Sequence, residues 1–543
     1  MHIAVRRSNG LKAEIYPKGS GIRIREIINT SGGEAYDDSY LVVIPAKLTG
    51  TVVKRKQFKD RDLAEEWADH QFQGFRKQGE EYFKATDDER ELPMKYRKLL
   101  CIIAMMMCIV GHAQSEEPNI ILIMADDMGQ ECLGTYGAKD YKTPNLDRLA
   151  EEGVKFNNCF ATPLCSPSRV SIMTGKYNYR NYEEFLHINP DEITFGNLFR
   201  DGGYRTAIAG KWQLGGDGNT INSLGFDEYC VNNIAKPKEV IREANGRYAF
   251  PLMYQNGRFL EDDEVRNKYG PDIILDFVCD FIDKKEDKPF FVYYPMILVH
   301  SPFVPTPHSK DWLKTEEKDP KYFSDMVEYT DDIVGRLLKH LGERDLLDNT
   351  LVIFTADNGT HRSITTRMST GEKIVGEKGM LTDAGLRVPL IASYGGKSPS
   401  RELNDLIDFS DILPTILQAA TIESSEEFVT DGHSFYPQII GRKGSPRKWA
   451  FCHYDPVTWF SDFNDHAGRV LMMDGYRMYN DGRMFSMVDR LNENQLPPSM
   501  DNEQRAAIRS EMEAIIAAFP DYDFDKNIER MKEIRDEIKA DRI

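Results

Sequence analysis

Cysteine is scarce in this sequence, and so is positive charge. Eight of the 543 residues are cysteine, and no two of them form a Cys-x-x-Cys pair. This distribution fits neither a disulfide framework nor the ligand spacing of a zinc site. The 69 lysines and arginines are outnumbered by 87 aspartates and glutamates, which gives a formal net charge of -18. That balance argues against a nucleic-acid-binding protein whose whole surface is electropositive, and a polyanionic ligand would need a local basic pocket.

Long apolar runs are also missing. Residues 94–113 (MKYRKLLCIIAMMMCIVGHA) hold an apolar run of twelve, which is too short to span a bilayer. Three positive residues precede the run, and small residues followed by polar ones come after it. The pattern is typical of a secretory signal peptide, although a buried core helix has a similar composition. We therefore expect the export machinery as a partner and a periplasmic or secreted location.

The segment before this signal, residues 1–93, is balanced in charge and carries no specific motif. It predicts three β-like runs (21–29, 40–45 and 51–58) and an amphipathic helix at 63–78, and it resembles the DNA-binding arm domains of phage-type integrases. The preferred interpretation is that translation starts at Met94, so that residues 1–93 are a gene-model artefact or a fusion remnant. The alternative is a DNA-binding module. No stable nucleic-acid partner is expected for the mature chain.

From residue 114 to 445, apolar strands alternate with helices, which predicts a large doubly wound α/β sheet, mostly parallel, with helices on both faces. The strands are expected at 119–124, 154–160, 204–209, 289–295, 350–356 and 390–394. The helices are expected at 143–153, 194–200, 270–285, 319–341 and 411–420. Residues 446–543 predict a smaller C-terminal α+β subdomain, in which Asp-Gly turns join short antiparallel strands and two helices follow.

Polar residues stand just beyond four of the predicted strands. They are Asp126 with Asp127, Lys211, His300, and Asp357 with Asn358. In open α/β sheets, ligands bind at the carboxyl ends of the strands. Carboxylate and amide oxygens there suit a divalent cation such as calcium or magnesium. Each position also has a plainer interpretation: solvated loop carboxylates, a surface lysine, or a structural histidine.

The pentapeptide Cys165-Ser166-Pro167-Ser168-Arg169 precedes a helix-compatible stretch. A thiol near a helix N-terminus lies in a positive partial field, which suits an anionic nucleophile or an anionic substrate. On the pentapeptide alone, a buried cysteine beside a turn explains the pattern equally well.

Several motifs occur together in one order: NIILIMADDMG, TPNLDRLAEEGVKF, CSPSR followed by TG, then GKW, HSPF, ADNG and KG…GLRVP. In this order the sequence resembles the type I, formylglycine-dependent sulfatases of the alkaline-phosphatase-like superfamily, and in particular secreted bacterial arylsulfatases. The resemblance runs from about Pro118 into the C-terminal region. It implies a sulfuric ester hydrolase with its catalytic domain at 114–445.

The resemblance also implies how the site is built. Cys165 would be oxidised to formylglycine by a separate maturation enzyme that reads Cys165, Pro167 and Arg169. A calcium ion would be bound by Asp126, Asp127, Asp357, Asn358 and the modified residue 165. A hydroxyl of the hydrated formylglycine would attack the sulfur of a sulfate ester. The residues implied in holding the sulfate and moving protons are Arg169, Lys211, His300 and Lys378.

One position departs from the pattern. Many members of the family carry histidine two residues after the lysine of GKW, and here that residue is Gln213. Glutamine can hydrogen-bond the hydrated aldehyde, but it cannot act as a base near neutral pH. We keep Gln213 among the catalytic residues and interpret the change as a trait of a subfamily.

The substrate expected by family analogy is a sulfated small molecule or saccharide. Candidate substrate contacts, besides Lys211, His300 and Lys378, are His308, His361 and Arg362, each of which is also explained as an ordinary loop residue. Two alternative functions stay open: a phosphodiesterase or phosphonate hydrolase of the same superfamily, and an inactive sulfoglycan-binding protein in which Cys165 is unmodified.

Overall fold

The computed structural model describes residues 117–540, except 233, 235–245, 285, 287, 313–317, 426–427, 459–461 and 488–493, together with five short strands in residues 3–58. The chain divides into two compact units, Met1–Gln114 and Ser115–Ile543. The predicted signal peptide at 94–113 and the predicted helix at 63–78 lie outside the described residues. In the described part, no helix is long and apolar enough to cross a membrane.

The first unit contains a five-stranded antiparallel sheet in which the strands follow one another in chain order. Its strands are β1 (Ile3–Ala4), β2 (Lys12–Ile15), β3 (Arg23–Ile27), β4 (Ser39–Ile44) and β5 (Lys54–Phe58). The three β-like runs predicted in this segment coincide with β3, β4 and β5.

The second unit is built on a ten-stranded sheet in the order β11-β10-β9-β8-β12-β6-β13-β16-β7-β17. Its five central strands from β9 to β13 are parallel, and β16 is reversed between β13 and β7. The strands are β6 (Asn119–Ala125), β7 (Val154–Phe160), β8 (Arg205–Lys211), β9 (Glu228–Asn232), β10 (Tyr254–Gln255), β11 (Arg258–Phe259), β12 (Phe290–Pro295), β13 (Thr350–Ala356), β16 (Arg387–Tyr394) and β17 (Arg401–Asp408).

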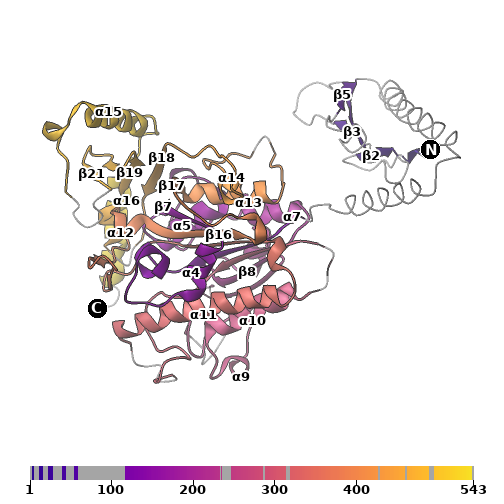
Figure 1. The fold of residues 1–543 in the computed structure, drawn as a ribbon, viewed down its shortest axis with the longest axis horizontal. Helices are drawn as coiled ribbons and strands as arrows, with labels where there is room; N and C mark the ends of the chain where they lie inside the picture. Colours follow the sequence, from indigo (N-terminus) through magenta and orange to yellow (C-terminus); the bar gives the residue numbers. More distant parts are fainter. Residues whose placement is uncertain are drawn as a thin grey trace, which may run out of the picture. The chain divides into compact units, whose positions relative to one another are not determined.

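Helices cover both faces of this sheet (Figure 1). On one face α4 (Pro144–Glu151) and α10 (Gly270–Ile282) pack against α11 (Phe323–Gly342). The other face carries α5 (Cys165–Thr174), α7 (Phe195–Asp201), α13 (Ile412–Ala419) and α14 (Tyr436–Ile439). Strands β6, β8, β12 and β13 are buried at every position, because parallel strands covered on both faces have no side exposed to water. The predicted doubly wound, mostly parallel fold is confirmed.

Shorter elements complete the main unit. They are α6 (Asn178–Asn181), α8 (Gly218–Ser223), α9 (Asp262–Val265), α12 (Asp383–Leu386) and the hairpin of β14 (Thr365–Arg367) with β15 (Lys373–Val375). Six of the sheet and hairpin strands were not predicted: β9, β10, β11, β14, β15 and β17. Most are two to five residues long, and the eight residues of β17 are largely polar because this strand forms the exposed edge of the sheet.

The C-terminal region forms a four-stranded antiparallel sheet in chain order, of which the last three strands were predicted and the first was not. Its strands are β18 (Trp449–Tyr454), β19 (Gly468–Met473), β20 (Tyr476–Tyr479) and β21 (Met484–Ser486), and α15 (Glu503–Ala517) and α16 (Phe524–Ala540) follow them. The predicted Asp-Gly turns lie between β19, β20 and β21. Phe519, just past α15, stacks on Phe451 of β18 with ring centroids 3.8 Å apart, which joins the helix to the sheet.

Candidate active site

The four strands whose ends carry polar residues are neighbours in the sheet. Their order is β8-β12-β6-β13, and all four run in the same direction. Ala125 of β6 is paired with Ala356 of β13, so Asp126 and Asp357 leave the sheet at the same level. Because parallel strands end at one edge, residues far apart in the chain are brought together there.

Two glycines allow the strand ends to approach closely. A Cβ at position 210 would lie 1.8 Å from the carbonyl oxygen of Pro295, at the end of β12. A Cβ at position 359 would lie 1.8 Å from the carbonyl oxygen of Ala384 in α12. Any other residue would push these backbones apart, so the glycines of GKW and ADNG are required by the packing of the site.

Two residues at this edge have left-handed backbones without being glycine. Asp127 has φ 61° and Gln213 has φ 55°. For residues with a Cβ this conformation costs about 1–2 kcal/mol, and it persists where the surrounding structure imposes it, often at functional sites. Gln213 is 8% exposed, and its Oε1 accepts no hydrogen bond in the described part of the chain.

The acidic residues form one cluster that is closed to solvent. Asp126, Asp127, Asp357 and Asn358 are all fully buried. The backbone amide of Asp127 donates to Oδ1 of Asp357 at 3.0 Å, and Nδ2 of Asn358 donates to Oδ1 of Asp127 at 3.0 Å. Three carboxylates this close repel one another unless positive charge is present among them.

Three cations contact these three carboxylates. Nζ of Lys211 lies 2.8 Å from Asp126. Nζ of Lys378 lies 2.7 Å from Asp127. Nη2 of Arg169 lies 2.6 Å from Asp357, and its Nη1 donates to the carbonyl oxygen of Lys211 at 3.2 Å.

These charges shift the pKa values of the cluster in opposite directions. Burial by itself would raise the pKa of Asp127, but positive charge, chiefly that of Lys378, outweighs burial and holds it well below its usual range. Burial and the neighbouring charge of Asp126 raise the pKa of Asp357 to about 6. The raised pKa of Asp357 indicates that Arg169 and Lys211 do not fully offset burial and the charge of Asp126, so a further cation beside this carboxylate would be favourable.

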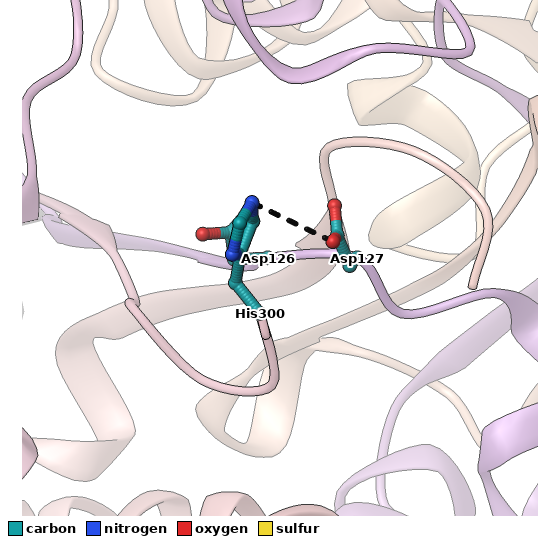
Figure 2. A group of neighbouring side chains, drawn as sticks. All are labelled: Asp126, Asp127 and His300. Carbon is teal, nitrogen blue, oxygen red and sulfur yellow. Dashed lines mark ion pairs between the residues drawn. The ribbon is translucent and has the colours of Figure 1, made fainter. Parts of the chain in front are cut away.

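The donor set fits calcium. Three carboxylates and an amide converge, all hard oxygen ligands, and Oδ1 of Asn358 is buried without accepting a hydrogen bond in the described part of the chain. Asp126, Asp127 and His300 also place one ligand atom each within 4.8 Å of one another (Figure 2). For calcium we favour the oxygen set, because an imidazole nitrogen is a ligand for softer metals.

Cys165 is the first residue of α5, and its side chain faces the charges of this cluster. The residue is 1% exposed, and burial raises the pKa of its thiol although Lys211 and Lys378 act in the opposite direction. The hydroxyl of the next residue, Ser166, donates to the carbonyl oxygen of Gln213 at 3.4 Å, which joins α5 to the end of β8. A neutral thiol is a poor nucleophile, so this cysteine is not prepared to react as a thiolate.

His300, in the loop after β12, lies beside Asp126 and Asp127. Its side chain is 18% exposed, and its Nε2 lies 3.7 Å from Oδ2 of Asp127, as the dashed line in Figure 2 shows. Burial, together with the charge of Lys378, lowers the pKa of His300 to about 3. The imidazole is therefore neutral near pH 7.

The structure brings some predicted substrate contacts to this site and leaves one apart. Nε of Arg362 donates to the carbonyl oxygen of Lys378 at 2.8 Å. His361 is half-buried and lies close enough to Asp127 and Lys378 for their charges to affect its pKa. The ring of His308 instead packs on Tyr329, with centroids 4.7 Å apart, and no contact in the described chain joins it to the cluster.

Arg247 is a site residue that the sequence did not reveal. Its Nη1 lies 2.9 Å from Nδ1 of His300. The sequence offered no signal for it, because residues 246–250 form no helix or strand and carry no recognisable motif.

The family profile described as Sulfatase matches residues 118–422, which is more than half of the chain. The chain belongs to the sulfatase family. As a sulfatase it is a sulfuric ester hydrolase, and the ordered motifs identified the family correctly.

Two curated sulfatases illustrate the likeness. The N-acetylgalactosamine-6-sulfatase of Canis lupus familiaris is 31% identical over 383 residues, which cover 64% of this chain and 70% of the relative. The N-acetylglucosamine-6-O-sulfatase of Bacteroides thetaiotaomicron is 25% identical, with 72% and 84% covered. The fold is shared with the solved structure of BT4656 in complex with its substrate D-glucosamine-2-N,6-O-disulfate, which has a TM-score of 0.57 and 22% identity, with 74% of this chain and 97% of that chain covered.

Proposed function

We propose that this sulfatase hydrolyses a sulfate ester on a saccharide, with residue 165 converted to formylglycine and with a calcium ion beside it. The observation that carries the proposal is the convergence of Arg169, Lys211 and Lys378 on a buried carboxylate cluster next to Cys165. A saccharide substrate is supported by the names of the curated relatives, which are sulfatases of N-acetylated hexosamines.

The three cations provide the local positive pocket that an acidic protein needs in order to bind sulfate. Their side chains are 1%, 0% and 9% exposed, so they act in surroundings of low dielectric. Donors fixed in advance and directed at a sulfuryl group stabilise the charge that spreads over its oxygens in the transition state. The N-terminus of the ten-residue helix α5 adds partial positive charge at residue 165.

The proposed site needs a calcium ion and a formylglycine, which the unmodified polypeptide does not supply. Asp126, Asp127, Asp357 and Asn358 would bind calcium, and residue 165 would complete the set. Calcium would supply a Lewis acid and the hydrated formylglycine a nucleophilic hydroxyl, with a second hydroxyl that allows sulfate to leave. An unmodified thiol has no second hydroxyl, so its sulfur adduct could not be released in this way.

Protons at this site are held by Lys378 and His300. Interaction with Asp127 keeps the pKa of Lys378 above its usual value despite burial, so the ammonium group holds its proton. His300 is neutral until a negative group approaches, and it can then donate from a ring nitrogen to the leaving oxygen. We assign both residues to protonation of the leaving group, with Lys378 as the donor that is charged before substrate binds.

We also propose that the protein is exported, on the basis of the pattern at residues 94–113, and that a maturation enzyme acts on Cys165. The mass of the peptide containing residue 165 tests the modification, because formylglycine is lighter than cysteine. Mass spectrometry of the native protein tests the predicted start at Met94, and peptides from residues 1–90 in the mature protein would contradict it.

Turnover of aryl sulfates is the test of the reaction, with Cys165→Ala as the inactive control. Aryl phosphate and phosphonate esters, measured beside the sulfate, test the phosphodiesterase alternative. Protein that carries formylglycine but hydrolyses no sulfate ester would overturn the proposal. Unmodified protein that binds sulfated glycans without turnover would favour the binding-protein alternative. A panel of sulfated saccharides then identifies the substrate.

A further inference from the structure

Arg247 is a cation at the active site that the proposed function leaves without a role. Its side chain is half-buried, and Nη1 contacts Nδ1 of His300 at 2.9 Å. The opposite ring nitrogen, Nε2, faces Asp127. Arg247 therefore contacts the imidazole at the ring nitrogen opposite the one that faces the carboxylate cluster.

The backbone holds Arg247 in this position. The next residue, Tyr248, is 3% exposed, and its hydroxyl donates to the carbonyl oxygens of Ile297 and His300. The amide of Gly270 donates to the carbonyl oxygen of Tyr248 at 2.7 Å, and a Cβ on Gly270 would lie 2.2 Å from the carbonyl oxygen of Arg247. These contacts hold the backbone at residues 247 and 248 against Gly270 and against the loop that carries His300.

No carboxylate in the described part of the chain balances the charge of this arginine. Within the described part of the chain, Arg247 forms no ion pair with a carboxylate, and its Nε and Nη2 donate no hydrogen bond. The three other cations of the site each contact an aspartate. A cation partly removed from water without an acidic partner is unfavourable, and an anionic ligand group would compensate for it.

We propose that Arg247 forms an anion-binding subsite for a second negatively charged substituent of the substrate. The guanidinium has a planar arrangement of donors that matches a carboxylate or a sulfate through two parallel hydrogen bonds. The substrate class is therefore an acidic saccharide that carries, besides the reacting ester, a second sulfate or a carboxylate within reach of the guanidinium beside His300. This inference rests on the proposed sulfatase activity and adds the class of saccharide.

The competing explanation is that Arg247 only orients the imidazole of His300. Kinetics with singly and doubly anionic substrates separate the two roles. Loss of an orienting residue lowers kcat/KM for every substrate by the same factor, whereas loss of an anion subsite raises KM selectively for the doubly anionic ones.

The experiment compares wild type, Arg247→Ala and Arg247→Lys on four probes: 4-nitrophenyl sulfate, a monosulfated hexosamine, a disulfated hexosamine and a sulfated disaccharide that contains a uronate. Arg200→Ala is the matched control, because Arg200 is partly exposed on α7 and its Nη1 donates to the carbonyl oxygen of Asn222. For an acidic saccharide that binds without turnover, its inhibition constant against 4-nitrophenyl sulfate takes the place of KM.

We expect Arg247→Ala to raise KM, or the inhibition constant, by about 10–100-fold for at least one doubly anionic saccharide. For the two singly anionic probes the increase should be at least about ten times smaller. Arg247→Lys should fall between wild type and alanine, because it keeps the charge but loses the paired donors. A loss confined to the disulfated probe identifies sulfate, and one confined to the uronate probe identifies carboxylate.

An equal loss on all four probes, or no loss on any, would overturn the subsite. So would wild-type protein that binds the two acidic saccharides no better than the monosulfated hexosamine. Wild-type protein that carries formylglycine yet hydrolyses no sulfate ester would instead contradict the proposed function, so the two failures are distinguishable.

Discussion

Lys211 and Asp126 form an ion pair at 2.8 Å in which neither side chain is exposed to water. Lys211 ends β8 and Asp126 follows β6, and β12 lies between these two strands. The same arrangement recurs twice at this edge, in Lys378 with Asp127 and in Arg169 with Asp357. An equal number of positive and negative groups has been removed from water, so a change on either side unbalances the site.

The first expected outcome concerns calcium. Adding calcium to metal-free protein should stabilise it by about 2.7 kcal/mol when the ion is present at 100 times its Kd. The reason is that the ion adds positive charge to three crowded carboxylates. Thermal unfolding with calcium or with chelator measures the effect. In Asp127→Asn the shift should shrink or vanish, and a wild-type protein indifferent to calcium would contradict the predicted site.

The second concerns the two-sided contact of Arg169. Arg169→Lys keeps the charge, but a lysine cannot reach Asp357 and the carbonyl oxygen of Lys211 together. We expect kcat/KM on an aryl sulfate to fall by about 10²–10³-fold, the size seen when one transition-state donor is removed. Arg200→Lys controls for the substitution itself. Because Arg169 is also predicted to be read during maturation, the formylglycine content of each variant must be matched before rates are compared.

Gln213 provides the third outcome. Gln213→Ala should lower turnover measurably, because it removes the buried amide whose Oε1 has no partner in the described chain. Gln213→Asn is the informative companion, since asparagine tolerates the left-handed backbone at φ 55° and keeps an amide. Gln213→His restores the residue that many members of the family carry. An unchanged rate in Gln213→Ala would show that this side chain does not touch the reacting groups.

The fourth concerns acid stability away from the active site. His453 in β18 is 3% exposed, and burial, together with the charge of Arg469, lowers its pKa to about 3. The unfolded chain has the ordinary pKa near 6.5, so it binds a proton first as the pH falls. The contribution of neutral His453 to the free energy of unfolding is therefore fully present above pH 6.5. It decreases as the pH falls, by about 2 kcal/mol between pH 6.5 and 5.

Unfolding midpoints measured over this pH range test that outcome. The His453→Gln variant should be less stable at neutral pH but should lose less stability on acidification than wild type does. His433→Gln, at an exposed position, is the matched control. Parallel pH profiles for wild type and His453→Gln would contradict the assignment.

Much of this organisation could be predicted from the sequence. Continuous apolar runs predicted β6, β12 and β13 because these strands are buried on both faces. The residues after them were predicted to share one edge, and the pairing of Ala125 with Ala356 shows why they do. The six polar positions at the four strand ends lie at one edge of the sheet, while their roles in catalysis stay predictions.

Other features of the fold and the site could not be predicted from the sequence. The edge strand β17 has no apolar alternation, because much of its length is exposed. Arg247 reaches His300 through tertiary packing of an irregular segment, which leaves no periodic signal. His308 was predicted as a substrate contact and that role stays a prediction, while its ring packs on Tyr329.

Every residue of α5, from Cys165 to Thr174, is buried. The maturation enzyme is predicted to read Cys165, Pro167 and Arg169. These three residues are thus inaccessible in the folded molecule. The proposed maturation enzyme would therefore have to engage these residues on a chain that has not yet completed its fold. The yield of active protein would then depend on the rate of folding relative to the rate at which Cys165 is modified, because molecules that fold first could no longer be modified. Slowing the folding of the nascent chain, or supplying more of the enzyme, should raise the active fraction without any change in the sequence.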